Sequence, residues 1–467
     1  MAQVLGSLDS FRTGFSGTVL TPGDDGYDAA RSVWNGAIDR HPAVIAQCTG
    51  AEQVAAAIAF ARESGLEISV RGGGHNFAGF AVVEDGLMID LSQMRSVSVD
   101  PAARRARCGG GATWADLDGA AQEHGLAVTG GFISHTGIAG LTLGGGIGWM
   151  TRMAGLSCDN LVGAEVVTAD GRILHASADE NPDLYWALRG GGGNFGVVTS
   201  FEFALHPVGP MVNFGMFFWG VDQGEQALRF CRDYVESVPE NNGILVGGLN
   251  APPAPFVPEQ HHFAPGYALF VVGFGTPEEH AAAIAPVRGA VPALFEFVSP
   301  IPYTMLQSMM DEGNPWGITA YEKALHLDEM SDGAIAVIAE HLPRKQSPLS
   351  FMPIFVVDGA YSRVPDDATA FSGKRSTRWV VNIAAVCPDP AALDGERQWV
   401  RDFWQALLPH AGNAGSYVNF MSEYEEDRVR AAYGAAKYDR LARIKAEYDP
   451  DNLFHLNANI KPALAAV

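Results

Sequence analysis

Residues 71–76 read Arg71-Gly72-Gly73-Gly74-His75-Asn76, and this stretch carries most of the information about the fold. Its three adjacent glycines, residues 72–74, have no Cβ atoms, so the backbone there can adopt positive φ angles and approach a ligand closely. The short strand Ile68-Ser69-Val70 precedes it, and an alanine-rich helix over residues 51–64 precedes that strand. We therefore expect His75 on a loop that follows a strand, with its imidazole beside whatever binds there.

Three further glycine-dense loops follow, at residues 108–111, 137–148 and 189–196. Exposed NH groups in such loops form concavities that bind anions, so four loops together favour a pyrophosphate and hence a dinucleotide. A single loop of this kind more often marks only a tight turn. A Rossmann fingerprint at Gly144–Gly148 is the competing interpretation, but that motif follows a strand and opens a helix, whereas these glycines sit inside a longer loop.

Composition limits the class of protein. The 467 residues are 47% hydrophobic, which is enough for sizeable cores, and no apolar run approaches the ~20 residues that span a bilayer. The net charge of −22 repels phosphate backbones and anionic membranes, so nucleic acid and membrane are not expected partners. Five cysteines without a CxxC pair support neither a disulfide framework nor a metal site. With no basic and apolar leader at the N-terminus, we expect a cytoplasmic protein.

Two kinds of segment follow one another along the chain. Residues 41–208 alternate β-branched runs with helical patterns, which predicts an α+β domain. Asp170-Gly171 joins two of these runs and suits the positive φ angles of a type I′ hairpin. Between 209 and 415, longer apolar runs alternate with helices at 223–238 and 277–288, which predicts an antiparallel sheet backed by helices.

At this point the residues resemble a known family. The flavin-binding domain of the vanillyl alcohol oxidase / p-cresol methylhydroxylase superfamily has this loop pattern. The stretch Asp183-Leu184-Tyr185-Trp186-Ala187-Leu188-Arg189-Gly190 and the C-terminal Tyr448-Asp449-Pro450-Asp451-Asn452-Leu453-Phe454 are similar to its berberine bridge enzyme-like group. The resemblance implies an FAD-binding domain over residues 1–208 with its core at about 38–208, a substrate domain over 209–415, and a C-terminal segment over 416–467 that returns to the first domain.

The resemblance also implies the flavin contacts. His75 matches the histidine bonded to the flavin 8α carbon, and Cys158, in Gly155-Leu156-Ser157-Cys158-Asp159-Asn160, matches the cysteine bonded to carbon 6. The alternatives are a loop histidine with ordinary hydrogen bonds and an inert buried cysteine. The other expected contacts lie in the glycine loops, on one strand and near the C-terminus: Arg71, Gly72, Gly73, Gly74, Asn76, Phe77, Gly137, Gly140, Leu141, Thr142, Gly145, Gly148, Val197, Val198, Asn457 and Asn459.

The residues expected to handle protons depart from the family pattern. In many relatives the base is the second tyrosine of a Tyr-x-Asn-Tyr motif, whereas this chain reads Tyr417-Val418-Asn419-Phe420. Val380 and Phe77 are also apolar at positions where relatives carry polar groups. The candidate substitutes are Tyr417, Asn382 and Arg378, each of which also suits strand packing or surface polarity.

The resemblance implies an FAD-linked oxidase that removes a hydride from an alcohol, a sugar or a secondary metabolite and passes the electrons to O₂, releasing H₂O₂. A dehydrogenase or an oxidative cyclase with another electron acceptor is the first alternative. Because Phe420 and Val380 carry no ionisable group, a flavin-binding module without catalysis is the second.

Overall fold

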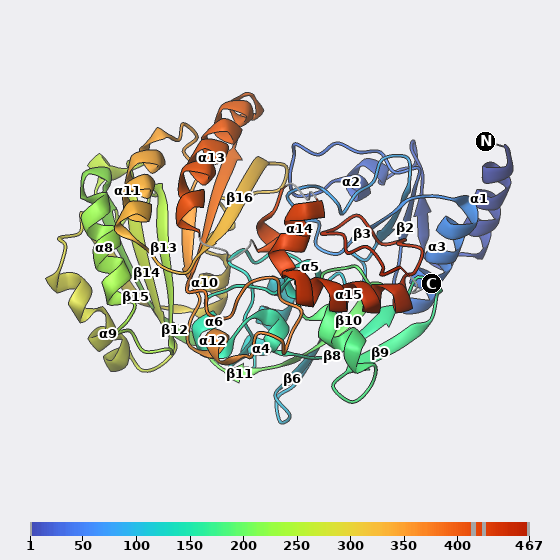
Figure 1. Cartoon of the computed structure of the whole chain (residues 1–467), viewed down its shortest axis with the longest axis horizontal. Helices are drawn as coiled ribbons and strands as arrows, with labels where there is room; N and C mark the ends of the chain where they lie inside the picture. Colours follow the sequence, from blue (N-terminus) through green and yellow to red (C-terminus); the bar gives the residue numbers. More distant parts are fainter. Residues whose placement is uncertain (1, 412–416, 423–425, 465–467) are drawn as a thin grey trace.

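The fold was determined as a computed structural model that describes residues 2–411, 417–422 and 426–464. Three main sheets build it, and Figure 1 shows the largest of them on one side of the molecule and the two smaller ones on the other. The expected boundary at 415/416 lies outside the described residues. Among the residues that are described, no helix is both long and apolar enough to cross a membrane.

The first sheet positions the glycine loop at residues 71–76. Its order is β1-β2-β4-β3, with β2, β4 and β3 parallel. The strands are β1 Thr18–Leu20, β2 Val44–Gln47, β3 Ile68–Arg71 and β4 Leu87–Asp90. Helix α3, Ala51–Ser64, ends at Gly65 in the left-handed region and buries its apolar face on this sheet, as its alanine-rich pattern predicted. Strand β3 therefore delivers the chain directly into the loop that carries His75.

The second sheet is fully antiparallel, in the order β5-β6-β10-β8-β9. Its strands are β5 Val97–Asp100, β6 Arg105–Gly109, β8 Leu161–Val167, β9 Ile173–Ser177 and β10 Val197–Ala204. The β8–β9 hairpin forms as expected, but its turn is not type I′. Only Gly171 has a positive φ, of 84°, and the Thr168 carbonyl accepts from the Gly171 amide. Asp170 stays outside the left-handed region because its carboxylate binds the Thr168 hydroxyl and the Arg172 guanidinium.

The third sheet has seven antiparallel strands in the order β15-β12-β14-β13-β17-β18-β16. They are β12 Met211–Gly220, β13 Asn242–Asn250, β14 Pro265–Gly273, β15 Phe295–Pro302, β16 Thr319–Leu327, β17 Met352–Val356 and β18 Trp379–Cys387. Four helices cover its outer face: α8 Gly224–Tyr234, α9 Pro277–Gly289, α11 Asp332–His341 and α13 Leu393–Leu407. This is the predicted antiparallel sheet backed by helices.

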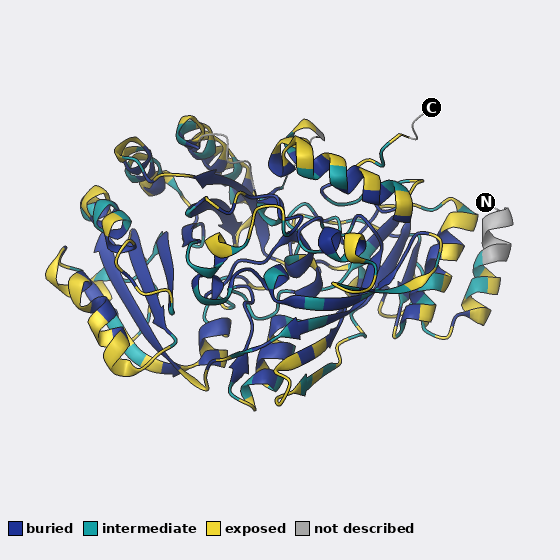
Figure 2. Cartoon of the chain, turned by 60° about the horizontal axis from the view of Figure 1, so that its bottom comes forward, coloured by how far each residue is buried: buried dark blue, intermediate teal, exposed yellow. Residues whose placement is uncertain are grey.

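Both faces of this sheet are buried, and side-chain alternation separates them. Phe217 and Trp219 of β12 pack against the helices, whereas Phe214, Met216 and Phe218 pack on the inner side. In Figure 2 the strands of this sheet are dark blue because they are buried, whereas the covering helices are yellow on their exposed outward faces. Polar residues at inner-face positions are therefore enclosed within the molecule.

The C-terminal helix α15, Ala435–Tyr448, packs on α7, Pro182–Leu188, and on the second sheet. The chain then turns back so that Asn457 and Ala458 reach the interior beside Asn194. A segment more than 200 residues away in sequence thus completes the first half of the molecule.

Candidate active site

A cavity of about 1110 Å³ lies between the glycine loops and the inner face of the seven-stranded sheet. Ligand sites commonly measure ~300–1000 Å³, so this one has room for a dinucleotide and part of a substrate. Three of the four glycine loops line it. They contribute Gly72, Gly73, Gly74, Gly137, Gly140, Gly144, Gly192, Gly193 and Gly196.

Two of these loops touch backbone to backbone. A Cβ on Gly73 would lie 2.3 Å from the Gly137 Cα, and a Cβ on Gly137 would lie 2.4 Å from the Gly73 amide nitrogen. Only glycine fits at this contact. The surface that Gly73 and Gly137 form, called the glycine cradle below, carries no side chains and is open to a bulky, flat or anionic group. Residues 138–144 of the predicted loop at 137–148 are in fact the short helix α5, Ile138–Gly144.

The remaining glycine loop, at 108–111, does not reach the cavity. A Cβ on Gly111 would lie 1.8 Å from the Leu91 carbonyl oxygen, and one on Gly109 would lie 2.1 Å from the Met94 carbonyl oxygen. These glycines allow β6 to pack against residues 91–94. This loop therefore has the tight-packing role that sequence alone could not separate from anion binding.

Most of the expected contacts line the cavity. They are His75, Gly72, Gly73, Gly74, Asn76, Phe77, Gly137, Gly140, Leu141, Val197, Val198, Asn457, Tyr417 and Asn382. The others do not: Arg71, Thr142, Gly145, Gly148, Asn459, Cys158 and Arg378.

Contacts elsewhere hold most of the residues that lie outside the cavity lining. The Arg71 guanidinium turns away to the Ala30 carbonyl, 2.7 Å from it, and to Asp90. Gly145, with φ of 136°, packs against the Phe371 ring, and a Cβ on Gly148 would overlap the Gly130 carbonyl. Thr142 is buried inside α5. Asn459 follows the cavity-lining Ala458 and is not itself part of the wall.

His75 stands at the cavity wall between two aromatic rings. Trp34 stacks on it at 5.3 Å and Trp316 meets it edge-on at 5.8 Å. Its Nε2 lies 2.8 Å from His135 Nδ1, and its Nδ1 lies 3.4 Å from the Thr136 hydroxyl. Burial, together with the neighbouring His135, lowers the pKa of His75 to about 3, so the imidazole is neutral at pH 7. A neutral imidazole has a nitrogen lone pair and is a nucleophile.

Cys158 does not share this position. It lies in the 3-10 turn Ser157–Asp159, fully buried in a cluster with Ile147 and Tyr417, and those two residues, not the thiol, line the cavity. Its Sγ lies 3.8 Å from the Asp159 carboxylate, which Arg375 holds in a two-pronged ion pair. Burial raises the pKa of the Cys158 thiol well above its usual range, so the nucleophilic thiolate is disfavoured. The structure therefore places the thiol that was expected to form a second flavin bond behind the wall of the cavity.

The three candidate bases occupy different environments. Arg378 lies at the entry to β18, outside the cavity, where it pairs with Glu236 and Asp358. The Tyr417 hydroxyl accepts from the Gly146 amide at 2.6 Å and from Asn419 at 2.8 Å, and burial raises its pKa. It is a structural hydrogen-bond acceptor and not a base.

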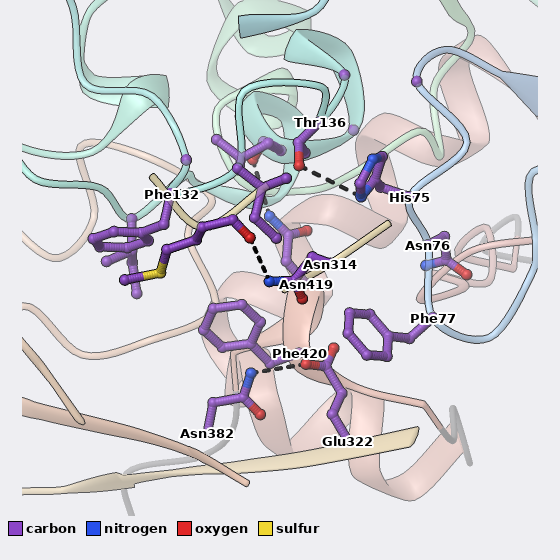
Figure 3. A pocket seen from close by; sticks show the side chains of 18 of the residues that line it. His75, Asn76, Phe77, Phe132, Thr136, Asn314, Glu322, Asn382, Asn419 and Phe420 are labelled. Atoms are coloured by element: carbon purple, nitrogen blue, oxygen red, sulfur yellow. Dashed lines mark hydrogen bonds between the residues drawn. The ribbon is translucent and has the colours of Figure 1, made fainter. Parts of the chain in front are cut away.

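Asn382, a candidate from the sequence, lines the cavity, and its hydrogen bond identifies a residue that sequence reasoning missed. Its Nδ2 donates to Glu322 Oε2 at 2.8 Å (Figure 3). Glu322 lies on β16, whose Tyr321 and Leu325 pack toward the helices, so its own side chain points into the cavity. Burial raises the pKa of this fully buried carboxyl to about 8. The signal in the sequence was a single acidic residue within Ile318–Leu327, a stretch that also holds Lys323 and His326.

Phenyl rings form much of the remaining wall, and Asn314, Ser350 and Asn419 add polar groups to it. Phe77, Phe351 and Phe420 lie near the carboxyl, and Phe420 stacks on Phe355 at 5.5 Å. Figure 3 shows Phe77 and Phe420 beside the Glu322–Asn382 pair. Phe420 therefore supplies shape and no proton acceptor, as its sequence position predicted, while Glu322 is the ionisable group of the wall.

A glycine cradle fed by a β-strand, a neutral histidine at its edge and a covering antiparallel sheet define an FAD-dependent oxidoreductase. Residues 42–177 match the model of the FAD binding domain family, and residues 416–461 match that of the berberine and berberine-like family. The chain belongs to the berberine bridge enzyme-like FAD-linked oxidases of the vanillyl alcohol oxidase superfamily.

Three relatives illustrate the match. The (R)-6-hydroxynicotine oxidase of Paenarthrobacter nicotinovorans is 31% identical, over 96% of this chain and 97% of its own length. The crystal structure of 6-hydroxy-D-nicotine oxidase from Arthrobacter nicotinovorans superposes with a TM-score of 0.85 at 29% identity, covering 96% of this chain and 99% of that one. Glucooligosaccharide oxidase from Acremonium strictum, described with a 6-S-cysteinyl, 8α-N1-histidyl FAD, shares the fold at a TM-score of 0.85 and 23% identity, covering 98% and 100%.

Proposed function

We propose that this protein is an FAD-dependent oxidase whose flavin is attached covalently through His75 alone, and that it oxidises a small apolar molecule with O₂ as the electron acceptor. The observation that carries the single attachment is the contrast between the two expected linking residues. His75 lines the cavity as a neutral imidazole, whereas Cys158 lies behind its wall as a protonated thiol.

The residues present fit FAD. The backbone contact between Gly73 and Gly137 leaves a surface that a Cβ would fill, and Gly192 and Gly193 have open space where a side chain would stand. Asn457 Oδ1 is buried without a hydrogen-bond partner among the described residues, beside the cavity. When bound, FAD supplies a two-electron acceptor for a hydride. The chain itself binds, orients and shields the substrate and provides Glu322 to exchange a proton.

The apolar wall favours an aromatic or alicyclic substrate over a sugar. A sugar exposes hydroxyls on most of its atoms, and each would need a polar partner within the cavity. The cavity wall includes, alongside polar groups such as those of Glu322, Asn314 and Asn382, five phenyl rings, from Phe214, Phe270, Phe351, Phe355 and Phe420. A secondary metabolite with one polar group near the reacting carbon fits this distribution best.

The test is the mass of the intact protein after denaturation, for the wild type and for two single variants. We expect one FAD on the wild type, none on His75→Ala, and one on Cys158→Ala, which serves as the matched control. Covalent flavin on His75→Ala, or its loss from Cys158→Ala, would contradict a single attachment at His75. Steady-state H₂O₂ formation compared with dye reduction then separates an oxidase from a dehydrogenase.

A further inference from the structure

The inner wall of the cavity presents two hydrogen-bond acceptors whose partners are missing. Asn382 Nδ2 donates to Glu322 Oε2, and this contact leaves Glu322 Oε1 and Asn382 Oδ1 without a hydrogen-bond partner in the described part of the chain. Glu322 is fully buried and Asn382 is 4% exposed. A buried polar atom without a partner costs stability, so two neighbouring ones facing a cavity indicate a ligand group that satisfies them.

A ligand group that keeps the carboxyl ionised must donate at least two hydrogen bonds here. With Glu322 ionised, both open atoms are acceptors, and they stand on adjacent strands, β16 and β18, that pair at Ala324 and Asn382. A hydroxyl donates one hydrogen, whereas a protonated primary or secondary amine donates two or more and carries a positive charge. An ammonium therefore satisfies the amide oxygen and the carboxylate together.

The charges around the cavity have the sign that a cation requires. Its described lining contains two carboxyls, Glu322 inside and Glu312 at the exposed rim, and neither lysine nor arginine. His75, the titratable group on the opposite wall, is neutral. Nothing in the lining that the structure describes repels an ammonium, and the aromatic faces nearby attract one.

We infer that Glu322 and Asn382 together bind the protonated nitrogen of an apolar amine, and that this amine is the substrate class of the enzyme. The assignment of the amine as the substrate rests on the proposed function. The binding of the amine by Glu322 and Asn382 does not. The phenyl rings of Phe77, Phe351 and Phe420 hold the hydrocarbon part of the amine, and the polar pair fixes its nitrogen.

The proton balance of binding follows from the buried carboxyl. In the free protein Glu322 holds its proton at pH 7, because burial without a counter-charge disfavours the carboxylate. When an ammonium enters, it supplies that counter-charge, and the carboxyl proton leaves to solvent. The net charge inside the cavity then stays the same, so no uncompensated charge is buried.

The experiment uses the purified holoprotein and 2-phenylpropan-2-amine, which has no hydrogen on the carbon beside nitrogen and so binds without being oxidised. The matched probe is 2-phenylpropan-2-ol, in which a hydroxyl replaces the amine. Affinities are measured by titration calorimetry for the wild type, Glu322→Gln and Asp118→Asn. Asp118 is the matched control, a buried carboxyl hydrogen-bonded to Gln307 outside the cavity lining.

We expect the wild type and Asp118→Asn to bind the amine about tenfold or more tightly than the alcohol, and Glu322→Gln to lose that preference. We also expect release of a proton on amine binding, seen as a heat that depends on the buffer, and its loss in Glu322→Gln. Equal affinity for the two probes, no saturable binding of the amine, or an unchanged preference in Glu322→Gln would each overturn the inference.

Failure of the proposed function gives a different result. If denatured wild-type protein carries no FAD while the amine still binds through Glu322, the oxidase proposal fails and the amine site stands. If the flavin is attached and an alcohol is oxidised while the amine preference is absent, the amine site fails and the oxidase stands.

Discussion

At the scale of single residues, the two ring nitrogens of His75 differ in their partners. His75 Nε2 lies 2.8 Å from His135 Nδ1, whereas His75 Nδ1 lies 3.4 Å from the Thr136 hydroxyl. A neutral imidazole carries one proton, so a proton on Nε2 that is shared with His135 leaves the lone pair on Nδ1. We infer that this tautomer attacks the flavin and that His135 accepts its proton.

The first prediction concerns His135→Leu, which removes the acceptor of the His75 Nε2 proton. We expect covalent attachment of FAD to slow by about 10²-fold, because the proton of the attacking imidazole then has no base to accept it. The measurement is the fraction of flavin that remains with denatured protein as a function of time. Ser134→Ala on the same loop is the control, because it loses the hydroxyl hydrogen bond to Asp311 and keeps the one from the backbone amide. If FAD becomes attached equally fast in both variants, His135 is not the acceptor of the His75 proton.

Glu322 leads to a prediction about pH. Its pKa rises from 4.5 to about 8 on folding, so between these values the native state holds one more proton than the unfolded state. Stability therefore falls as pH rises through this window, by up to ~1.4 kcal/mol per pH unit from this group. Glu322→Gln removes the term, and its stability relative to wild type should be greater at pH 8 than at pH 5 in urea unfolding. An identical pH dependence of the two proteins would show that the carboxyl ionises freely.

At the scale of elements, the loop after β3 and the start of α5 can touch only because both residues at their contact, Gly73 and Gly137, are glycines. We predict that Gly73→Ala destabilises the protein and weakens FAD retention, because its Cβ would lie 2.3 Å from Gly137 backbone atoms that cannot move independently. Gly119→Ala is the control, since it lies exposed within α4, Trp114–Gln122, with nothing within 4 Å of its Cβ. It should stabilise by about 0.5–1 kcal/mol. Thermal unfolding of both variants measures the difference, and equal shifts would contradict the close contact.

The elements also show what sequence can and cannot predict. Helix 51–64, strand 68–70 and the antiparallel sheet were predictable because local periodicity and glycine placement determine them. The expected flavin contacts that lie outside the cavity lining could not be recognised from the sequence, for a different reason. Cys158 lies in a turn and Arg71 at the end of a strand, and the direction in which each side chain points decides whether it faces the cavity. That direction depends on contacts with partners such as Asp159 and Ala30. Glu322 was missed because its significance lies in its burial, and burial follows from the position of β16 in the sheet.

At the scale of the whole molecule, a buried ion pair within the C-terminal segment contacts the FAD-binding half through the Asn194 carbonyl. Lys445 Nζ lies 2.6 Å from Asp449 Oδ2, and both side chains are fully buried. The ammonium also donates to the Asn194 and Phe454 carbonyls, and the carboxylate accepts from the Leu453 and Phe454 amides. This network explains why Asp449 stands in the Tyr448–Phe454 motif, since its side chain folds the segment back.

The last prediction follows from this network. Lys445→Met leaves a buried carboxylate without its counter-charge, so we expect a loss of about 3–5 kcal/mol in the free energy of unfolding. Asp449→Asn added to Lys445→Met should recover part of it, because no unpaired charge then remains. Arg443→Met, exposed on the same helix, should stay within about 0.5 kcal/mol of wild type. Urea unfolding gives these values, and denatured mass tests whether flavin attachment fails in step, as expected if Asn457 and Ala458 leave the cavity. A Lys445→Met protein as stable as Arg443→Met would mean that the Lys445–Asp449 pair does not stabilise the fold.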